Sequence, residues 1–173
     1  ALRATLLVFL TLLFVSNTNA QTVAAGDIAI VGVNMDGPSA NTDEITIVAL
    51  AAIPSGTTIY FSDYYWDNTN NRWGNDGLNG TTANGTEGII KWTTTSTITA
   101  GSVYKISWTM GSGTPSVSGL PGTLTVASGQ TGTTSSGPLG TGGDNIFIYQ
   151  SNNNGVTPSN WIFGWCNSLS TSV

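Results

Sequence analysis

The heptapeptide Ser102-Val103-Tyr104-Lys105-Ile106-Ser107-Trp108 alternates between two kinds of side chain, and this alternation decides the fold class. Val103 and Lys105 fall on one face of an extended backbone, and the apolar Tyr104, Ile106 and Trp108 fall on the other. This period of two is typical of an antiparallel strand with one buried and one solvated face. The sequence therefore predicts a half-buried strand over Ser102–Trp108.

Seven further segments have the composition of short strands, because apolar runs alternate with clusters of Gly, Pro, Asn and Thr. A helical period of 3.6 residues is not sustained anywhere after Asp27. The segments are Asp27–Val33, Glu44–Ala51, Thr57–Ser62, Gly88–Thr93, Thr123–Ala127, Asn145–Gln150 and Trp161–Trp165. Eight short strands at this spacing predict an all-β fold, an antiparallel β-sandwich of immunoglobulin-like or jelly-roll-like type. Two long stretches, 63–87 and 109–143, are expected to be irregular apart from the strand Thr123–Ala127 within the second.

The composition excludes most classes of enzyme. The 173 residues include no His and one Cys, so a Ser-His-Asp or Cys-His relay, a thiolate zinc cage and an intrachain disulfide are all excluded. Asp and Glu number nine, and no pair of them is spaced in a way that signals a glycosidase. We therefore expect a protein that is not an enzyme.

The surface implied by the sequence is polar but poor in charge. Only 8 % of the residues are charged, whereas Thr, Ser and Asn together make up about a third of the chain. The four basic residues are scattered, which argues against nucleic acid as a partner. Such a neutral polar surface suits the cell exterior or a packed assembly.

Residues 1–20 have the pattern of a secretory signal: Arg3, then an apolar run from Leu6 to Val15, then small polar residues up to Ala20. The run is too short to span a bilayer stably. The pattern predicts a secreted or cell-surface protein. Two outcomes stay open: the segment is cleaved and the mature chain begins at Gln21, or it is retained as a donor strand that inserts into a neighbouring subunit. In the second case the assembly residues are Leu6, Leu7, Val8, Phe9, Leu10, Leu12, Leu13, Phe14 and Val15.

Residues 21–173 are expected to form a single sandwich domain. Few residues follow the last strand, so we also consider a domain that lacks its closing strand and is completed by another chain. Cys166 stands beside Trp165 and is expected to be a small buried side chain.

Two kinds of binding residue are candidates within the stretch 63–87. Tyr64, Tyr65, Trp66 and Trp73 could stack on sugar rings, and the alternative is that these aromatic residues are core anchors. Asn79 and Asn84 begin two N-glycosylation sequons, so the exterior is expected to be glycosylated.

Calcium is the metal ion that the carboxylates would suit, although neither candidate set matches a known calcium loop. One set is Asp36, Asp43 and Glu44, and the other is Asp63, Asp67 and Asp76. We assign no metal site and no cofactor from the sequence.

Five segments carry a resemblance to a known type of domain. They are Ala25–Gly37, Ile45–Ala51, Ile53–Asp63, Glu87–Trp92 and Gly143–Gln150. Together they resemble a β-domain that recurs in secreted surface proteins of Bacteroidota and other bacteria, and they have a remote similarity to the lamin-tail type of immunoglobulin-like sandwich. The resemblance covers about residues 25–150 and carries no catalytic motif. It implies export, a sandwich fold and no established activity.

Two hypotheses about function follow. The first is a structural subunit of an extracellular fibre or surface layer, which self-assembles through its apolar N-terminal segment and is glycosylated. The second is a secreted monomeric module for carbohydrate binding or adhesion, which uses the loop aromatics, with or without calcium. The expected partners are other copies of the chain and glycans.

Overall fold

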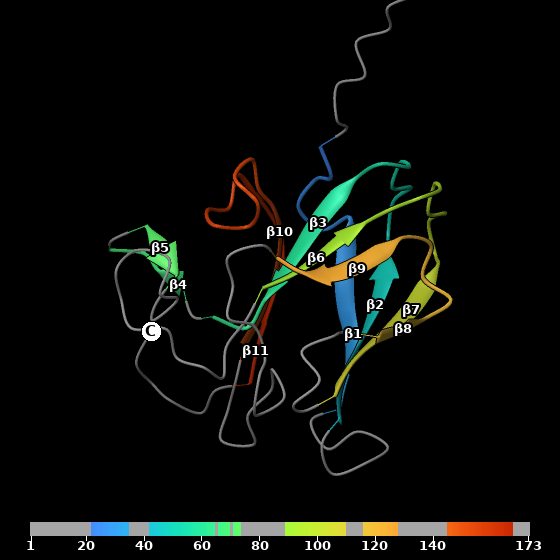
Figure 1. Ribbon diagram of the computed structural model, residues 1–173, viewed down its shortest axis with the longest axis horizontal. Coiled ribbons are helices and arrows are strands. Elements are labelled where there is room, and N and C mark those ends of the chain that lie inside the picture. The colour runs from blue at the N-terminus through green and yellow to red at the C-terminus, as the bar shows by residue number, and fades with distance from the viewer. Residues whose placement is uncertain are drawn as a thin grey trace, which may run out of the picture.

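The computed structural model describes residues 22–34, 42–64, 66–69, 71–73, 89–109, 116–127 and 145–167. The regular elements within these ranges are all β-strands, and Figure 1 shows how the strands are arranged. The strands are β1 (Ile28–Asn34), β2 (Thr42–Ala49), β3 (Thr58–Ser62), β4 (Trp66–Asp67), β5 (Arg72–Trp73), β6 (Ile89–Thr93), β7 (Val103–Thr109), β8 (Ser116–Ser118), β9 (Thr123–Val126), β10 (Asn145–Gln150) and β11 (Asn160–Cys166).

Two antiparallel sheets pack face to face. One sheet has the order β1-β2-β7-β8, and the other has the order β11-β10-β3-β6-β9. This confirms the prediction of an all-β sandwich. Each of the eight predicted strands is present within two residues of its predicted ends. The prediction of irregular structure is wrong at β4, β5 and β8, which lie inside the two long stretches.

The core between the sheets is built from residues that alternate along each strand. Ile45 and Ile47 of β2 face Ile59 and Phe61 of β3 across this space, and all four are buried. Burying one such side chain contributes about 1.5–3 kcal/mol. The alternation predicted for β7 is confirmed, because Val103 is 57 % exposed and Ile106 is fully buried.

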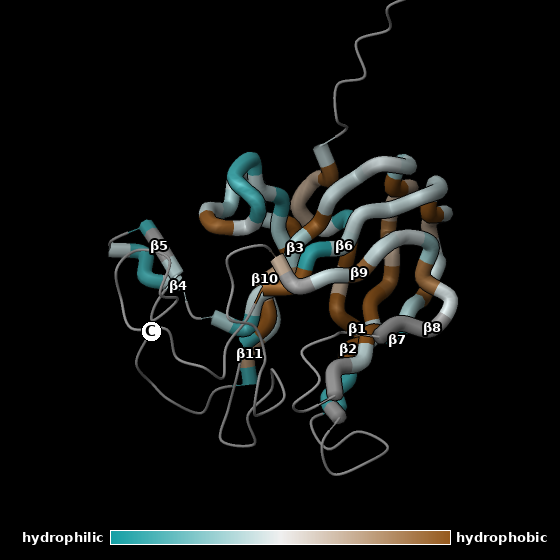
Figure 2. Tube along the Cα trace, in the orientation of Figure 1, coloured by the Kyte–Doolittle hydropathy of each residue, from teal (hydrophilic) through white to brown (hydrophobic). Residues whose placement is uncertain are grey.

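The five-stranded sheet is apolar on its outer face as well. Tyr60, Ile89 and Tyr149 point away from the main core and belong to a second cluster of buried residues, which we call the outer cluster. Two segments cover it: the β4–β5 hairpin, and the loop 151–159 that joins β10 to β11. In Figure 2 this loop is coloured mostly hydrophilic, in contrast to the strands beneath it.

Candidate functional site

The first residues that the structure describes are bound along the edge of the five-stranded sheet. Val23 is 3 % exposed and packs in the main core. Its backbone N–H donates to Gln150 Oε1 at 2.9 Å, and its carbonyl oxygen accepts a hydrogen bond from Asn160 Nδ2. The N–H of Gly26 donates to Ile162 O of β11 at 2.9 Å. Val23, which comes shortly after the segment 1–20, is thus held by two side-chain amides, and we call this arrangement the Val23 clamp.

A tight turn over Ala24–Asp27 then carries the chain from one sheet to the other. Asp27 Oδ2 accepts the N–H of Ala24 at 2.7 Å, and the N–H of Asp27 donates to Ala24 O at 3.1 Å. Gly26 has a φ of +87°, a conformation that glycine adopts without steric cost. The carbonyl of Asp27 accepts the N–H of Leu50, so the turn ends against β2. The clamp and the turn together fix the start of β1.

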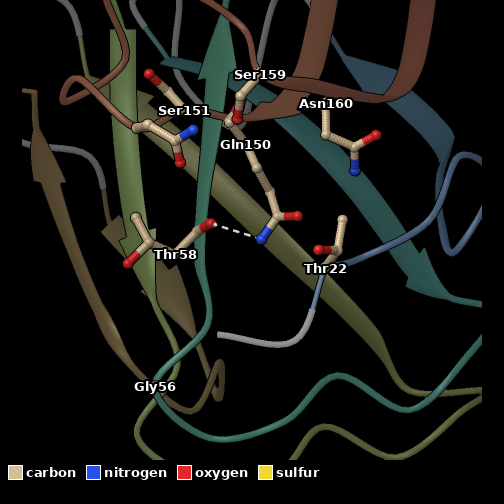
Figure 3. A pocket seen from close by; sticks show the side chains of 8 residues that line it. Thr22, Gly56, Thr58, Gln150, Ser151, Ser159 and Asn160 are labelled. Atoms are coloured by element: carbon tan, nitrogen blue, oxygen red, sulfur yellow. Dashed lines mark hydrogen bonds between the residues drawn. The ribbon is translucent and has the colours of Figure 1, made fainter. Parts of the chain in front are cut away.

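A cavity of about 340 Å³ lies beside the clamp. It is lined by Thr22, Gly56, Thr58, Gln150, Ser151, Asn152, Ser159 and Asn160. Figure 3 shows the Gln150 amide in the middle, with Thr58 on one side and Thr22 and Asn160 on the other. The lining consists of hydroxyl, amide and backbone groups and carries no formal charge, so the cavity offers hydrogen bonds without an acid or a base.

The predicted sugar-stacking residues are placed differently from one another. Tyr64 and Trp73 are fully buried in the outer cluster, Trp66 is half-buried against it, and Tyr65 lies outside the described residues. Trp66 and Trp73 face each other across the β4–β5 hairpin, with ring centroids 4.9 Å apart. A sugar platform needs an exposed ring face, and Tyr64 and Trp73 present none in this structure.

Hydrogen bonds fix the aromatic rings of the outer cluster. Gly155 O accepts the indole N–H of Trp73 at 3.3 Å and the hydroxyl of Tyr149 at 2.8 Å. Burial raises the pKa of Tyr149 well above its ordinary value, and the neighbouring Tyr60 adds to this effect. The Tyr149 phenol is therefore neutral at physiological pH and acts as a donor in a packed structure.

Sequence reasoning missed one aromatic residue at the surface of this cluster. Trp161 of β11 is 38 % exposed, and its ring centroid lies 5.1 Å from that of Trp66. The sequence did indicate that this face of the sheet is covered. The uninterrupted apolar runs Ile59-Tyr60-Phe61 and Ile146–Tyr149 are typical of strands buried on both faces, and such strands require a second cover.

The carboxylates proposed as calcium ligands do not converge where they are described. Asp43 is buried on the core side of β2, and the adjacent Glu44 points to the opposite face. Across the described ranges, no group of three or more His, Cys, Asp or Glu residues is arranged to hold a metal ion. Asp36 and Asp76 lie outside those ranges.

Glu44 takes part in a local ion pair instead. Lys105 Nζ and Ser107 Oγ of β7 donate to its carboxylate oxygens at 3.2 Å each. Partial desolvation by itself raises the pKa of Glu44, but these hydrogen bonds outweigh it and hold the pKa below its ordinary value.

The other predicted residues fall outside the described part of the chain. They are the glycosylation candidates Asn79 and Asn84 and the assembly residues Leu6, Leu7, Val8, Phe9, Leu10, Leu12, Leu13, Phe14 and Val15. Cys166, at the end of β11, is exposed, so the expectation that it is buried is wrong. It is the last residue of β11, which is an edge strand of the five-stranded sheet.

Comparison of the chain with protein-family models, with curated proteins and with solved structures finds no match. Within the described ranges, no helix has the length and apolarity that crossing a membrane would require.

Proposed function

We propose that this protein is a structural, non-enzymatic subunit of an extracellular fibre or surface layer, joined to its neighbours by the apolar segment Leu6–Val15. The observation that most supports this proposal is the Val23 clamp. It holds Val23, close to the C-terminal end of that segment in the sequence, through hydrogen bonds on both sides of this buried residue. Because the chain is already held at Val23, less conformational entropy is lost when the preceding segment binds a neighbour.

The energetics of the segment also support assembly. Its nine large apolar side chains lie within one short stretch that is interrupted only by Thr11, and an apolar surface of that size needs cover in water. Burying them would contribute more than about 10 kcal/mol before the costs of association are subtracted. The segment thus has enough apolar surface to hold two subunits together.

The outer face of the four-stranded sheet offers a surface for a neighbouring copy. Val31, Leu50 and Val103 are 59 %, 58 % and 57 % exposed. Val48 stands opposite Val103 and points to the same side of the sheet. Exposed apolar residues gathered in this way are more common at interaction surfaces than on isolated monomers.

The proposal is tested by introducing a charge into the segment. Phe9→Asp should abolish fibres in negative-stain electron microscopy, because a carboxylate is costly to bury without a partner. The matched control is Thr69→Asp, which adds the same charge at an exposed position of the β4–β5 turn and should leave the fibres intact. Abundant fibres from Phe9→Asp, or native fibres whose chains all begin at Gln21, would contradict the proposal.

The alternative function is a secreted carbohydrate-binding or adhesion module. Trp161 favours it, because this partly exposed ring is held against Trp66 at the surface of the outer cluster. Trp161→Ala should then remove retention in affinity gels that contain polysaccharide, with and without calcium. Leu50→Ala removes a similarly exposed apolar side chain from the other sheet and serves as the control. Equal mobility of the two variants and the parent chain would argue against sugar binding at Trp161.

A further inference from the structure

The cavity beside the Val23 clamp contains polar groups whose hydrogen-bonding capacity exceeds what the fold uses. Gln150 Nε2 carries two hydrogens, and its contact with Thr58 O is 3.5 Å long, at the outer limit for a hydrogen bond. Figure 3 shows this amide among the side chains that line the cavity, with the dashed contact to Thr58. The exposed side chains of Thr22 and Asn152 stand at its rim. A donor on the cavity wall is thus available to an incoming acceptor.

The rest of the wall is held rigidly. Ser159 donates to Gln150 O through both its N–H, at 2.8 Å, and its hydroxyl, at 3.1 Å. On the far side of the loop, Ser151 Oγ accepts the N–H of Gly155 at 3.0 Å. Gly155 in turn lies against Tyr60 in the outer cluster. A preformed wall of this kind binds a ligand with little ordering cost.

The chemistry of the wall selects one class of ligand. None of the eight lining residues is charged, and the net charge of the chain is −5, so an anion is disfavoured. None has a large apolar side chain, so an apolar ligand would gain little. A volume of about 340 Å³ is at the small end of ligand pockets and accommodates one sugar ring. A neutral sugar supplies both donors and acceptors at short spacing, which amide and hydroxyl groups match.

We infer that this cavity binds a neutral monosaccharide unit, free or at the end of a glycan, with Gln150 Nε2 donating to a sugar oxygen. The proposed assembly does not require this cavity. The cavity is also separate from the aromatic surface at Trp161, which is not among its lining residues. Because Thr22 lines the cavity and Gln150 also binds Val23, a bound sugar contacts both the neighbour of Val23 and the amide that holds it. Occupancy of the cavity therefore stabilises the clamp.

The test is an NMR titration of the isotopically labelled full chain with glucose, galactose and mannose separately, up to high millimolar concentration. At least one sugar should cause saturable shifts of the backbone amides at residues 22–23, 56–58, 150–152 and 159–160. The same sugar should slow hydrogen exchange at the Val23 amide, because ligand binding stabilises the state that binds it. If none of the sugars causes saturable shifts, the cavity holds only water and the inference is overturned.

Two variants locate the site. Gln150→Glu keeps the oxygen that accepts the Val23 N–H but removes the donor, and it should weaken binding about tenfold. Asn152→Ala removes an exposed amide from the rim of the cavity and should also weaken sugar binding. It serves as the second variant if Gln150→Glu fails to fold. Thr125→Val, on the exposed face of β9, is the control and should bind like the parent chain. Binding unchanged in both cavity variants, or shifts centred on Trp161, would overturn the assignment of this cavity while leaving fibre assembly untouched.

Discussion

Replacing Gly155 with alanine tests how tightly the loop 151–159 closes the outer cluster. Gly155 has a φ of +90°, and an alanine Cβ there would lie 2.9 Å from Tyr60 Cδ1 and 3.1 Å from Ile89 Cγ2. The left-handed backbone costs an L-residue about 1–2 kcal/mol. Displacing a buried ring and methyl group costs about 1–3 kcal/mol more. We therefore expect Gly155→Ala to lower the free energy of unfolding by about 2–5 kcal/mol, a large part of the total stability of a domain.

A matched variant separates the two contributions. Gly101 has a nearly equal φ of +85°, but nothing lies within 4 Å of the position its Cβ would take. Gly101→Ala should therefore cost only the backbone part, about 1–2 kcal/mol. Urea denaturation of both variants and the parent chain, followed by tryptophan fluorescence, measures the difference. Losses that agree within about 0.5 kcal/mol would refute the close packing of Gly155 against Tyr60.

Three further predictions concern the outer cluster, the clamp and the ion pair. Trp73→Ala should lower the free energy of unfolding, measured in urea, by about 3–5 kcal/mol, because this fully buried ring joins the hairpin to the sheet. A much smaller loss would mean that the hairpin does not pack on the sheet. Gln150→Ala should cost about 0.5–1.5 kcal/mol and speed hydrogen exchange at the Val23 amide, whereas unchanged exchange would argue against the clamp. The pKa of Glu44 is lowered on folding, so its contribution is present above the ordinary value of 4.5 and is lost as pH falls below it. Glu44→Gln should remove that part of the pH dependence between pH 7 and about 3 in denaturation curves, and parallel curves for variant and parent would contradict this.

Much of the sandwich could be predicted because its main strands carry strong local signals. The alternation along β7 and the Gly-containing turns before β3 and β7 fix the strands and their faces without any knowledge of the partners. The two-residue strands β4 and β5 could not be found in this way. A period of two is undefined over two residues, and their pairing depends on Trp66 and Trp73 meeting across an Asn-rich turn.

The sites were harder to predict, because their geometry depends on contacts between distant segments. Gln150 and Asn160 look like ordinary strand ends in the sequence, and only the fold brings them to the backbone of Val23. For the aromatic residues of the stretch 63–87, the sequence leaves two interpretations open, a sugar-binding surface and core anchors. The buried Tyr64 and Trp73 cover the sheet, because Tyr60, Ile89 and Tyr149 leave an apolar outer face that needs a cover.

The Val23 clamp also sets an order of events during folding. Its donor and acceptor groups are separated by 127 and 137 residues along the chain, and Asn145 of β10 bonds to Asp63 O across 82 residues. Contacts of such high sequence separation form slowly, because a long loop must close before they are gained. During synthesis Val23 emerges long before Gln150 and Asn160, so the hydrogen bonds of the clamp form only after β10 and β11 have followed. A chain therefore holds Val23 in place only once its sandwich is complete, and the assembly proposed above would begin from folded subunits.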